Sequence, residues 1–207
     1  MTGSTDTKKS KKGEDKMIIN IKLTSHEAQI FNLTKEEFEV MLHDNNLYST
    51  DGAMLIAVPT IYDGPRVSIH WPSNRKIGRS KANSVTLTID TDKRLVTAES
   101  GYWGEVKVSA NWNDDCKFPY RGLDGIYESL SKNDSKIKDL AAPQYGIDFS
   151  ILKKITDVIG TKIILSSFGN EKDPIAVKVN IATAYQFTVP FDESKHRPSV
   201  IMPMRTR

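Results

Sequence analysis

The amino-acid sequence predicts an α+β protein with far more sheet than helix, made mostly of antiparallel strands and a few helices. Two observations predict this class. Beyond residue 17, apolar and polar residues alternate in short runs bounded by turn-forming residues, as they do along half-buried strands. Only a few windows change to the apolar spacing of a helix. With 207 residues, 38% of them hydrophobic, the chain is long and apolar enough to bury a core.

Residues 1–16 differ in composition from the rest of the chain. They contain five lysines against three acidic residues, and no large apolar residue beyond Met1. This composition predicts a disordered basic tail, which acts either as a solubilising leader or as a nonspecific contact to nucleic acid. Since the whole chain carries a net charge of +3, the body is nearly neutral, which is not typical of a high-affinity DNA-binding protein.

The first ordered segments are expected to be strands, at residues 17–23 and 28–33. Residues 34–45, with the sequence TKEEFEVMLHDN, then follow helical spacing and begin with the capping-box pattern Thr-x-x-Glu. The expected buried stripe of this helix is Phe38, Met41 and Leu42, and the expected exposed face is Lys35, Glu36, Glu37 and Glu39.

The middle of the chain is expected to be sheet. Alternating patterns predict strands at residues 53–62, 66–71, 84–90, 94–100 and 104–112. The sequence TDKR at 91–94 predicts the turn of a hairpin. The remaining segments are expected to be a basic connector with one helical turn at 74–84, a turn-rich connector at 113–125, and a short helix within 126–144 that is broken at KNDSK.

The C-terminal part alternates between one clear helix and several strands. Residues 146–160 predict a strand end and a helix that stops at Gly160. The apolar face of this helix is expected to consist of Ile151, Leu152, Ile155, Val158 and Ile159. Strands are expected at 161–168, 174–182, 184–189 and 199–204.

Motifs that carry catalysis or metal binding are lacking. There is no phosphate-binding loop or dinucleotide fingerprint, and the four histidines (26, 43, 70 and 196) are scattered. Asp114 and Asp115 are best interpreted as a solvated turn, and Cys116 as a buried inert thiol. We therefore expect no enzyme activity, no metal and no cofactor. A single cysteine and no long apolar run predict a protein of the reducing cytoplasm.

A strip of aromatic residues is interleaved with cations in the middle of the chain. On a small barrel such a strip would form a stacking platform for single-stranded nucleic acid; otherwise the rings fill the core face of a sheet, which the low density of cations favours. The rings are Tyr102, Trp103, Trp112, Phe118 and Tyr120, and the cations are Lys107, Lys117 and Arg121.

Three segments resemble parts of a known family. The sequences YGIDFSILKKITDVIG (145–160), TKIILSSFGNEKDPIAVKVN (161–180) and SVIMPMR (199–205) resemble the last half-domain of the bacterial DNA polymerase sliding clamp, the β clamp. STDGAMLIAVP (49–59) resembles the Thr-Asp-Gly strand of that family, and KFPYRGL (117–123) resembles its Phe-Pro-x-Tyr-Arg linker. The chain is identified as a shortened, bacteriophage-type member of this superfamily.

The resemblance implies a sliding-clamp fold, with a clamp-like N-terminal domain at 17–125 and a C-terminal half-domain at 126–207. It also implies a non-catalytic processivity factor, which tethers DNA polymerases and other replication or repair proteins through a hydrophobic peptide-binding pocket. Carried over by position, the pocket residues are Thr50, Gly52, Leu55, Pro119, Leu123, Val200, Met202, Pro203, Met204 and Arg205.

A clamp also encircles duplex DNA through nonspecific phosphate contacts, usually as a ring of several subunits, here in the host cytoplasm. The residues expected to contact DNA are Lys153, Lys154, Arg75, Lys76, Arg79 and Lys81. The alternatives are a β-rich protein that binds single-stranded nucleic acid, and a clamp-mimicking decoy or structural phage protein. For SVIMPM itself, the alternative is an edge strand that completes a sheet.

Overall fold

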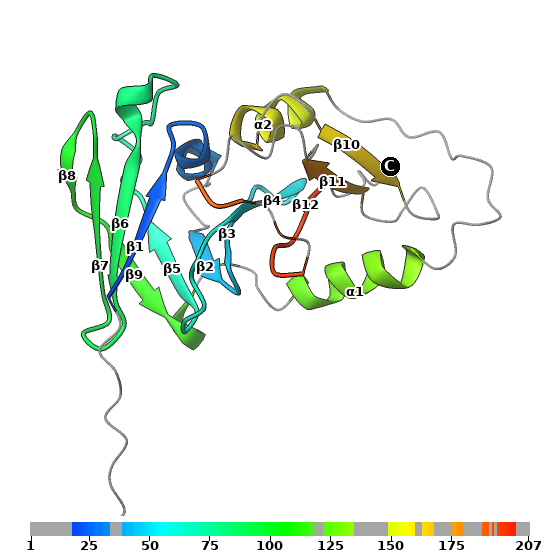
Figure 1. Cartoon of the computed structure of the whole chain (residues 1–207), viewed down its shortest axis with the longest axis horizontal. Coiled ribbons are helices and arrows are strands. Elements are labelled where there is room, and N and C mark those ends of the chain that lie inside the picture. The colour runs from blue at the N-terminus through cyan, green and yellow to red at the C-terminus, as the bar shows by residue number, and fades with distance from the viewer. Residues whose placement is uncertain are drawn as a thin grey trace, which may run out of the picture.

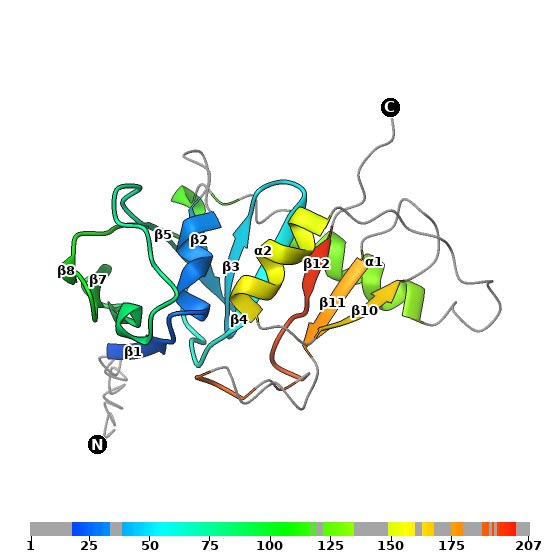
Figure 2. The same cartoon turned by 90° about the horizontal axis from the view of Figure 1, so that it is seen from above.

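The computed structural model describes residues 18–33, 39–116, 118, 122–134, 149–159, 163–167, 175–179, 188–190, 192 and 194–201. The expected basic tail at 1–16 lies outside these residues, as do 34–38 of the expected first helix and 184–187 of an expected strand. Figures 1 and 2 show the chain from two directions.

The described strands form two sheets, a small sheet in the order β1-β6-β7-β8 and a large sheet in the order β10-β11-β12-β4-β3-β2-β5-β9. Every pairing is antiparallel, so the α+β class is confirmed. The strands are β1 (Ile18–Leu23), β2 (Val40–His43), β3 (Asn46–Thr50), β4 (Met54–Pro59), β5 (Val67–His70), β6 (Val85–Asp90), β7 (Leu95–Ser100), β8 (Gly104–Val106), β9 (Ser109–Trp112), β10 (Ile163–Ser167), β11 (Ile175–Val179) and β12 (Ser199–Ile201).

Short helices connect and cover these strands. The described α-helices are α1 (Leu123–Asp134) and α2 (Phe149–Ile159), and the described 3-10 helices are η1 (Glu27–Leu33), η2 (Lys81–Asn83) and η3 (Asn113–Asp115). In Figures 1 and 2, α1 and α2 lie on opposite sides of the large sheet. The domain boundary expected between residues 125 and 126 stays a prediction, and the large sheet contains strands from both sides of it.

The two faces of the large sheet carry separate hydrophobic clusters. Along β4, Met54, Ile56 and Val58 face the main core, together with the small sheet, η1 and α2. Leu55 and Ala57 face the opposite way, toward α1. Since successive side chains of a strand point to opposite faces, a strand that is covered on both sides must be apolar throughout, as MLIAVP is.

The small sheet follows the predicted alternation closely. In β6 the side chains of Val85, Leu87 and Ile89 are buried, whereas the threonines between them are partly exposed. The hairpin predicted at TDKR is confirmed, because β6 pairs with β7 in the register Asp90 to Leu95. The Asp90 carboxylate accepts a hydrogen bond from the Lys93 amide at 3.0 Å, which holds the turn.

The predictions for residues 28–45 were wrong. The expected strand at 28–33 is the 3-10 helix η1, and the described part of the expected helix contains the strand β2. Strand geometry places Met41 in the cluster under α1 and Leu42 in the main core, on opposite faces instead of one helical stripe. Glu39, expected on an exposed face, is buried and accepts hydrogen bonds from Ser68 and Asn111.

Three further predictions need correction. Residues 46–50 were not expected to be a strand, but β3 pairs with both β2 and β4 at the centre of the large sheet. The single strand expected at 104–112 is divided, because β8 belongs to the small sheet and β9 to the large one. In the expected strand at 184–189, the described residues Thr188 and Val189 form a bend.

The C-terminal elements agree better with the prediction. The helix α2 ends one residue before Gly160, and Ile151, Ile155, Val158 and Ile159 are all buried. The strand β12 is not an edge strand, because it pairs with β11 on one side and β4 on the other. Within the described residues, β12 is the strand that joins the β10–β11 hairpin to the rest of the large sheet.

Candidate functional site

The candidate site is the hydrophobic cluster on the α1 side of the large sheet, which we call the α1 cluster. It brings together three segments that are far apart in the sequence: the TDGAMLIA segment, the linker that leads into α1, and the C-terminal strand. Its buried members are Met41, Tyr48, Leu55, Ala57, Phe118, Leu123, Tyr127, Ala176 and Val200.

The structure places some of the predicted pocket residues in this cluster. Leu55, Leu123 and Val200 are members, and Val200 lies opposite Leu55 in the β12–β4 register. All three are buried. Pro119, Met202, Pro203, Met204 and Arg205 lie outside the described residues.

Thr50 and Gly52 belong to the turn between β3 and β4. The Thr50 hydroxyl donates to the Met54 carbonyl at 2.7 Å and accepts from the Gly52 amide at 3.1 Å. Gly52 has φ +88° and open space around it, a backbone conformation that other residues rarely adopt. Thr50 and Gly52 therefore shape the turn that begins β4.

Asp51, the third member of this turn, connects it to α2. Its carboxylate accepts hydrogen bonds from the amides of Ala53 and Met54, and it pairs with Lys154 at 2.8 Å. Burial raises the pKa of Asp51, but the Lys154 and amide hydrogen bonds outweigh it and hold the pKa below its usual value. Lys154, predicted to contact DNA, is thus an intramolecular partner.

The chain before β12 is held by specific contacts. The buried Asn46 side chain accepts from the Arg197 amide at 3.1 Å, and the Tyr127 hydroxyl donates to the Pro198 carbonyl at 3.0 Å. The Arg197 guanidinium lies 5.1 Å from the centre of the Tyr127 ring. Within β12, the Ser199 hydroxyl accepts from the Ala57 amide at 3.0 Å. The last described strand is therefore fixed by β3, β4 and α1.

A buried histidine closes the turn that precedes this segment. Nδ1 of His196 accepts from the Asp192 amide at 2.8 Å, and Nε2 lies 3.4 Å from the Thr60 carbonyl oxygen. A neutral ring with its proton on Nε2 satisfies both contacts. Burial lowers the pKa of His196 from its ordinary value.

Glu27 connects the segment around residue 188 to the N-terminal part of the fold. Its buried carboxylate accepts from the Thr188 amide and hydroxyl, both at 2.7 Å, and from the Thr24 amide at 2.6 Å. The Glu27 amide in turn donates to the Thr24 hydroxyl at 3.2 Å, the reciprocal pattern of a capping box. The sequence TSHE at 24–27 carries the Thr-x-x-Glu signal of this capping box.

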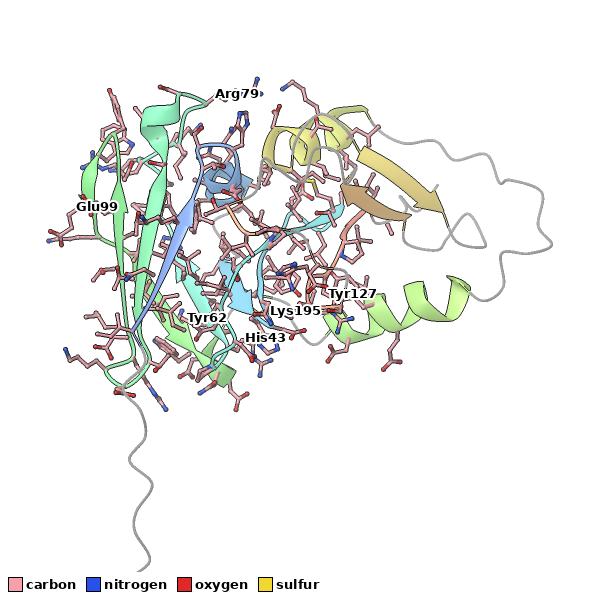
Figure 3. All side chains as sticks on the ribbon, in the orientation of Figure 1. His43, Tyr62, Arg79, Glu99, Tyr127 and Lys195 are labelled. Atoms are coloured by element: carbon pink, nitrogen blue, oxygen red, sulfur yellow. The ribbon has the colours of Figure 1, made fainter. Side chains whose placement is uncertain are left out.

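The residues predicted to contact DNA do not form one surface of free cations. Arg79 and Lys153 both pair with Asp157, at 2.6 and 2.9 Å, and Arg75 stacks on Trp103. Lys76 is exposed. For Lys81 the structure gives the backbone position, in η2. Figure 3 shows Arg79 on the same side of the molecule as α2.

The predicted aromatic strip is divided by the fold. Trp112 and Phe118 are buried, the first with its Nε1 donating to the Arg94 carbonyl and the second beside Tyr48. Tyr102 and Trp103 remain exposed at the β7–β8 turn. Tyr120 lies outside the described residues. The strip does not form one continuous platform.

Two groups that could serve catalysis, the Cys116 thiol and the Glu39 carboxylate, are buried. Burial raises the pKa of the Cys116 thiol, whose Sγ lies 3.2 Å from the Asn111 carbonyl oxygen. Glu39 accepts from the Ser68 hydroxyl in the same region. Asp114 and Asp115 are exposed in η3, as expected. Within the described residues, no group of three or more His, Cys, Asp or Glu side chains is placed to hold a metal ion.

Sequence reasoning missed all three ring-bearing members of the α1 cluster, Tyr48, Phe118 and Tyr127, although the last two carried a usable signal. Tyr127 lies four residues after Leu123, the spacing that puts both on one face of α1. Phe118 precedes Pro119 in the linker motif. The i, i+4 spacing from Leu123 could have identified Tyr127, and the linker motif could have identified Phe118.

Comparisons with protein-family models, curated proteins and solved structures find no significant match for this chain. In the described part of the chain, neither α-helix has the length and apolar character needed to cross a membrane.

Proposed function

We propose that the protein is a non-catalytic, sliding-clamp-like scaffold of bacteriophage type, which tethers replication or repair proteins through a hydrophobic pocket. The observation that carries the proposal is the convergence of three distant segments on the α1 cluster. Leu55, Leu123 and Val200 were assigned to one pocket from a sequence resemblance, and they lie in one cluster of the fold.

In this proposal the buried residues Leu55, Leu123 and Val200 would contribute the base of the pocket. The methionines at 202 and 204, which follow β12 in the sequence, would contribute further apolar surface. Methionine is flexible and polarisable, so it suits a surface that accepts several related peptides. The occupant would be a short segment with leucine and phenylalanine side chains, anchored in an apolar depression.

Duplex DNA is the second proposed partner. Arg79, Lys153 and Lys154 are paired with carboxylates, but each has about half of its side chain exposed. Surface ion pairs of this kind contribute only about 0–1 kcal/mol, so phosphates can compete for the cations. Such contacts are independent of sequence and weaken as salt increases. A homo-oligomeric ring would also keep the protein on DNA by encircling the duplex.

Calorimetric titration with a short clamp-binding peptide, rich in leucine and phenylalanine, tests the pocket. The unmodified protein is expected to bind it with micromolar affinity, and Met202→Ala plus Met204→Ala to weaken binding about tenfold or more. Leu95→Ala is the matched control, because Leu95 is an exposed apolar residue of the small sheet. Absence of binding by the unmodified protein would contradict the proposal. So would an equal loss of peptide affinity in the double methionine variant and in Leu95→Ala.

A further inference from the structure

An exposed aromatic pair lies at the tip of the β7–β8 hairpin. Tyr102 has 65% and Trp103 36% of its surface exposed, although large apolar side chains are usually buried. Their rings meet edge to face, with centroids 4.8 Å apart. A contiguous exposed pair of this kind is typical of an interaction site.

The hairpin tip is held rigidly against the connector at 71–84. The Gly101 amide donates to the Ser84 carbonyl at 2.9 Å, and a Cβ at Gly101 would overlap the Ala82 carbonyl oxygen. The amides of Tyr102 and Trp103 both lie within hydrogen-bond distance of the Ser100 hydroxyl. The two rings are therefore presented on a fixed turn, which reduces the entropy lost when a partner binds.

Arg75 is fixed beside the same rings. Its guanidinium carbon lies 4.5 Å from the Trp103 ring centre. Its backbone is held from both sides, since its amide donates to the Pro72 carbonyl and its carbonyl accepts from Nε1 of the buried Trp71. Trp71 is in turn stacked on Phe31. A core tryptophan thus positions a cation over a surface tryptophan.

The connector between β5 and β6 supplies cations beside the pair. Arg75 lies over the Trp103 ring and its neighbour Lys76 is exposed, whereas Arg79 pairs with Asp157. The same hairpin carries two acidic side chains, Glu99 and Glu105, which lie opposite each other on β7 and β8. In Figure 3, Glu99 lies on the outer side of the small sheet, whereas Arg79 lies at its end.

We propose that Tyr102, Trp103, Arg75 and Lys76 form a stacking site for single-stranded nucleic acid. The rings and the guanidinium plane would stack on unpaired bases, and the lysine would contact the phosphate backbone. Paired bases in a duplex cannot offer their faces to a side chain, so the site selects a single strand. This activity is separate from the α1 cluster, and either can exist without the other.

Fluorescence anisotropy with a labelled thymidine oligonucleotide of about 16 nucleotides tests the site, with a duplex of equal length for comparison. Tyr102→Ala and Trp103→Ala are each expected to weaken single-strand binding about 5- to 100-fold and to leave duplex binding nearly unchanged. Trp103→Phe keeps a stacking ring and should retain most of the affinity. Arg75→Ala should weaken binding and reduce its dependence on salt.

Glu99→Gln is the matched control, since it changes an exposed residue of the same hairpin and should not lower the affinity. Peptide titration of the Tyr102→Ala variant, expected to be normal, separates this site from the proposed pocket and shows that the fold is intact. Single-strand binding that survives the combined Tyr102→Ala and Trp103→Ala change would overturn the proposal. Duplex binding that is as tight as single-strand binding, and that the two substitutions weaken equally, would also overturn the proposal.

Discussion

Single buried polar side chains fasten the C-terminal part of this chain to the N-terminal part. Glu27 holds Thr188, Asn46 holds the Arg197 amide, and His196 contacts Thr60. Each pair is separated by more than 130 residues. Buried polar groups must be paired, so the loss of one partner leaves a costly unsatisfied group.

Glu27→Ala is expected to lower the free energy of unfolding by about 2–4 kcal/mol, because the Thr24 and Thr188 amides lose a charged, buried acceptor. Urea denaturation measures the change. Glu27→Gln keeps one acceptor oxygen and should cost less. Equal stability of the Ala variant and the unmodified protein would show that Glu27 does not hold the Thr188 segment.

His196 predicts how stability depends on pH. Burial lowers its pKa in the folded state, so the unfolded chain takes up the proton first as the pH falls. Its contribution to stability is complete above about pH 6.5 and is lost as the pH falls through the lower, folded pKa. Asp192 and Lys195, the charged groups that face the ring, have opposite effects on this pKa.

Urea denaturation between about pH 7.5 and pH 5 tests this effect, with His196→Gln as the comparison. The unmodified protein should lose stability over this range more steeply than the variant, which lacks the titrating ring. If the free energy of unfolding falls equally with pH in the two proteins, the loss of stability belongs to groups other than His196.

At the scale of elements, β12 determines whether the large sheet is one unit. It contributes three residues, and it pairs with β11 and β4 at the same time. Val200 and Ile201 also belong to opposite hydrophobic clusters, so β12 contributes to both faces of the sheet. The apolar character of Val200 and Ile201 is thus explained by their position inside a sheet.

A chain truncated after Pro198 is therefore expected to lose protection of the β10–β11 amides in hydrogen exchange, because that hairpin loses its hydrogen-bonded connection to β4. A chain truncated after Ile201 is the matched control. It keeps β12, so the amides should stay protected, whereas peptide binding should be lost with the two methionines. Equal protection in both truncated chains would contradict this role of β12.

The helix α2 is joined to the β3–β4 turn by the Lys154–Asp51 pair, whereas Lys153 pairs within the helix. Lys154→Met should lower the free energy of unfolding by about 1 kcal/mol, since the Asp51 carboxylate is mostly buried and loses its cation. Lys153→Met should change it by less than about 0.5 kcal/mol. Thermal or urea denaturation of both variants measures these changes. A larger loss of stability in Lys153→Met than in Lys154→Met would contradict the prediction.

At the scale of the whole molecule, the large sheet is covered on both sides, by α1 on one face and by α2, η1 and the small sheet on the other. This arrangement places the α1 cluster on one side of the large sheet. The aromatic pair lies at the tip of the small sheet, so the two proposed sites are on different elements.

The proposed ring makes a prediction about assembly. Size-exclusion chromatography with light scattering should give a mass that is a multiple of the chain mass and that depends on concentration. A chain lacking residues 1–16 is the control, because loss of the basic tail should not change the subunit number. A monomer at every concentration would rule out the ring and leave the peptide pocket as the separate test of the clamp proposal.

Local sequence patterns were sufficient to predict the class of fold, most strands and the clearest helix. Val85, Leu87 and Ile89 alternate with polar residues, and Ile151, Ile155, Val158 and Ile159 repeat at helical spacing, so local periodicity was sufficient. The sequence also singled out Leu55, Leu123 and Val200, which the fold brings together.

The other elements depend on contacts between segments that are distant in the sequence. VMLH at 40–43 is compatible with a helix or a strand, and it became a strand because β3 and β5 supply hydrogen bonds on both sides. The two halves of 104–112 pair with different sheets, which no local pattern encodes. Ser199, Val200 and Ile201 became an inner strand for the same physical reason: a strand is stabilised by its neighbours, and those lie far away in the sequence.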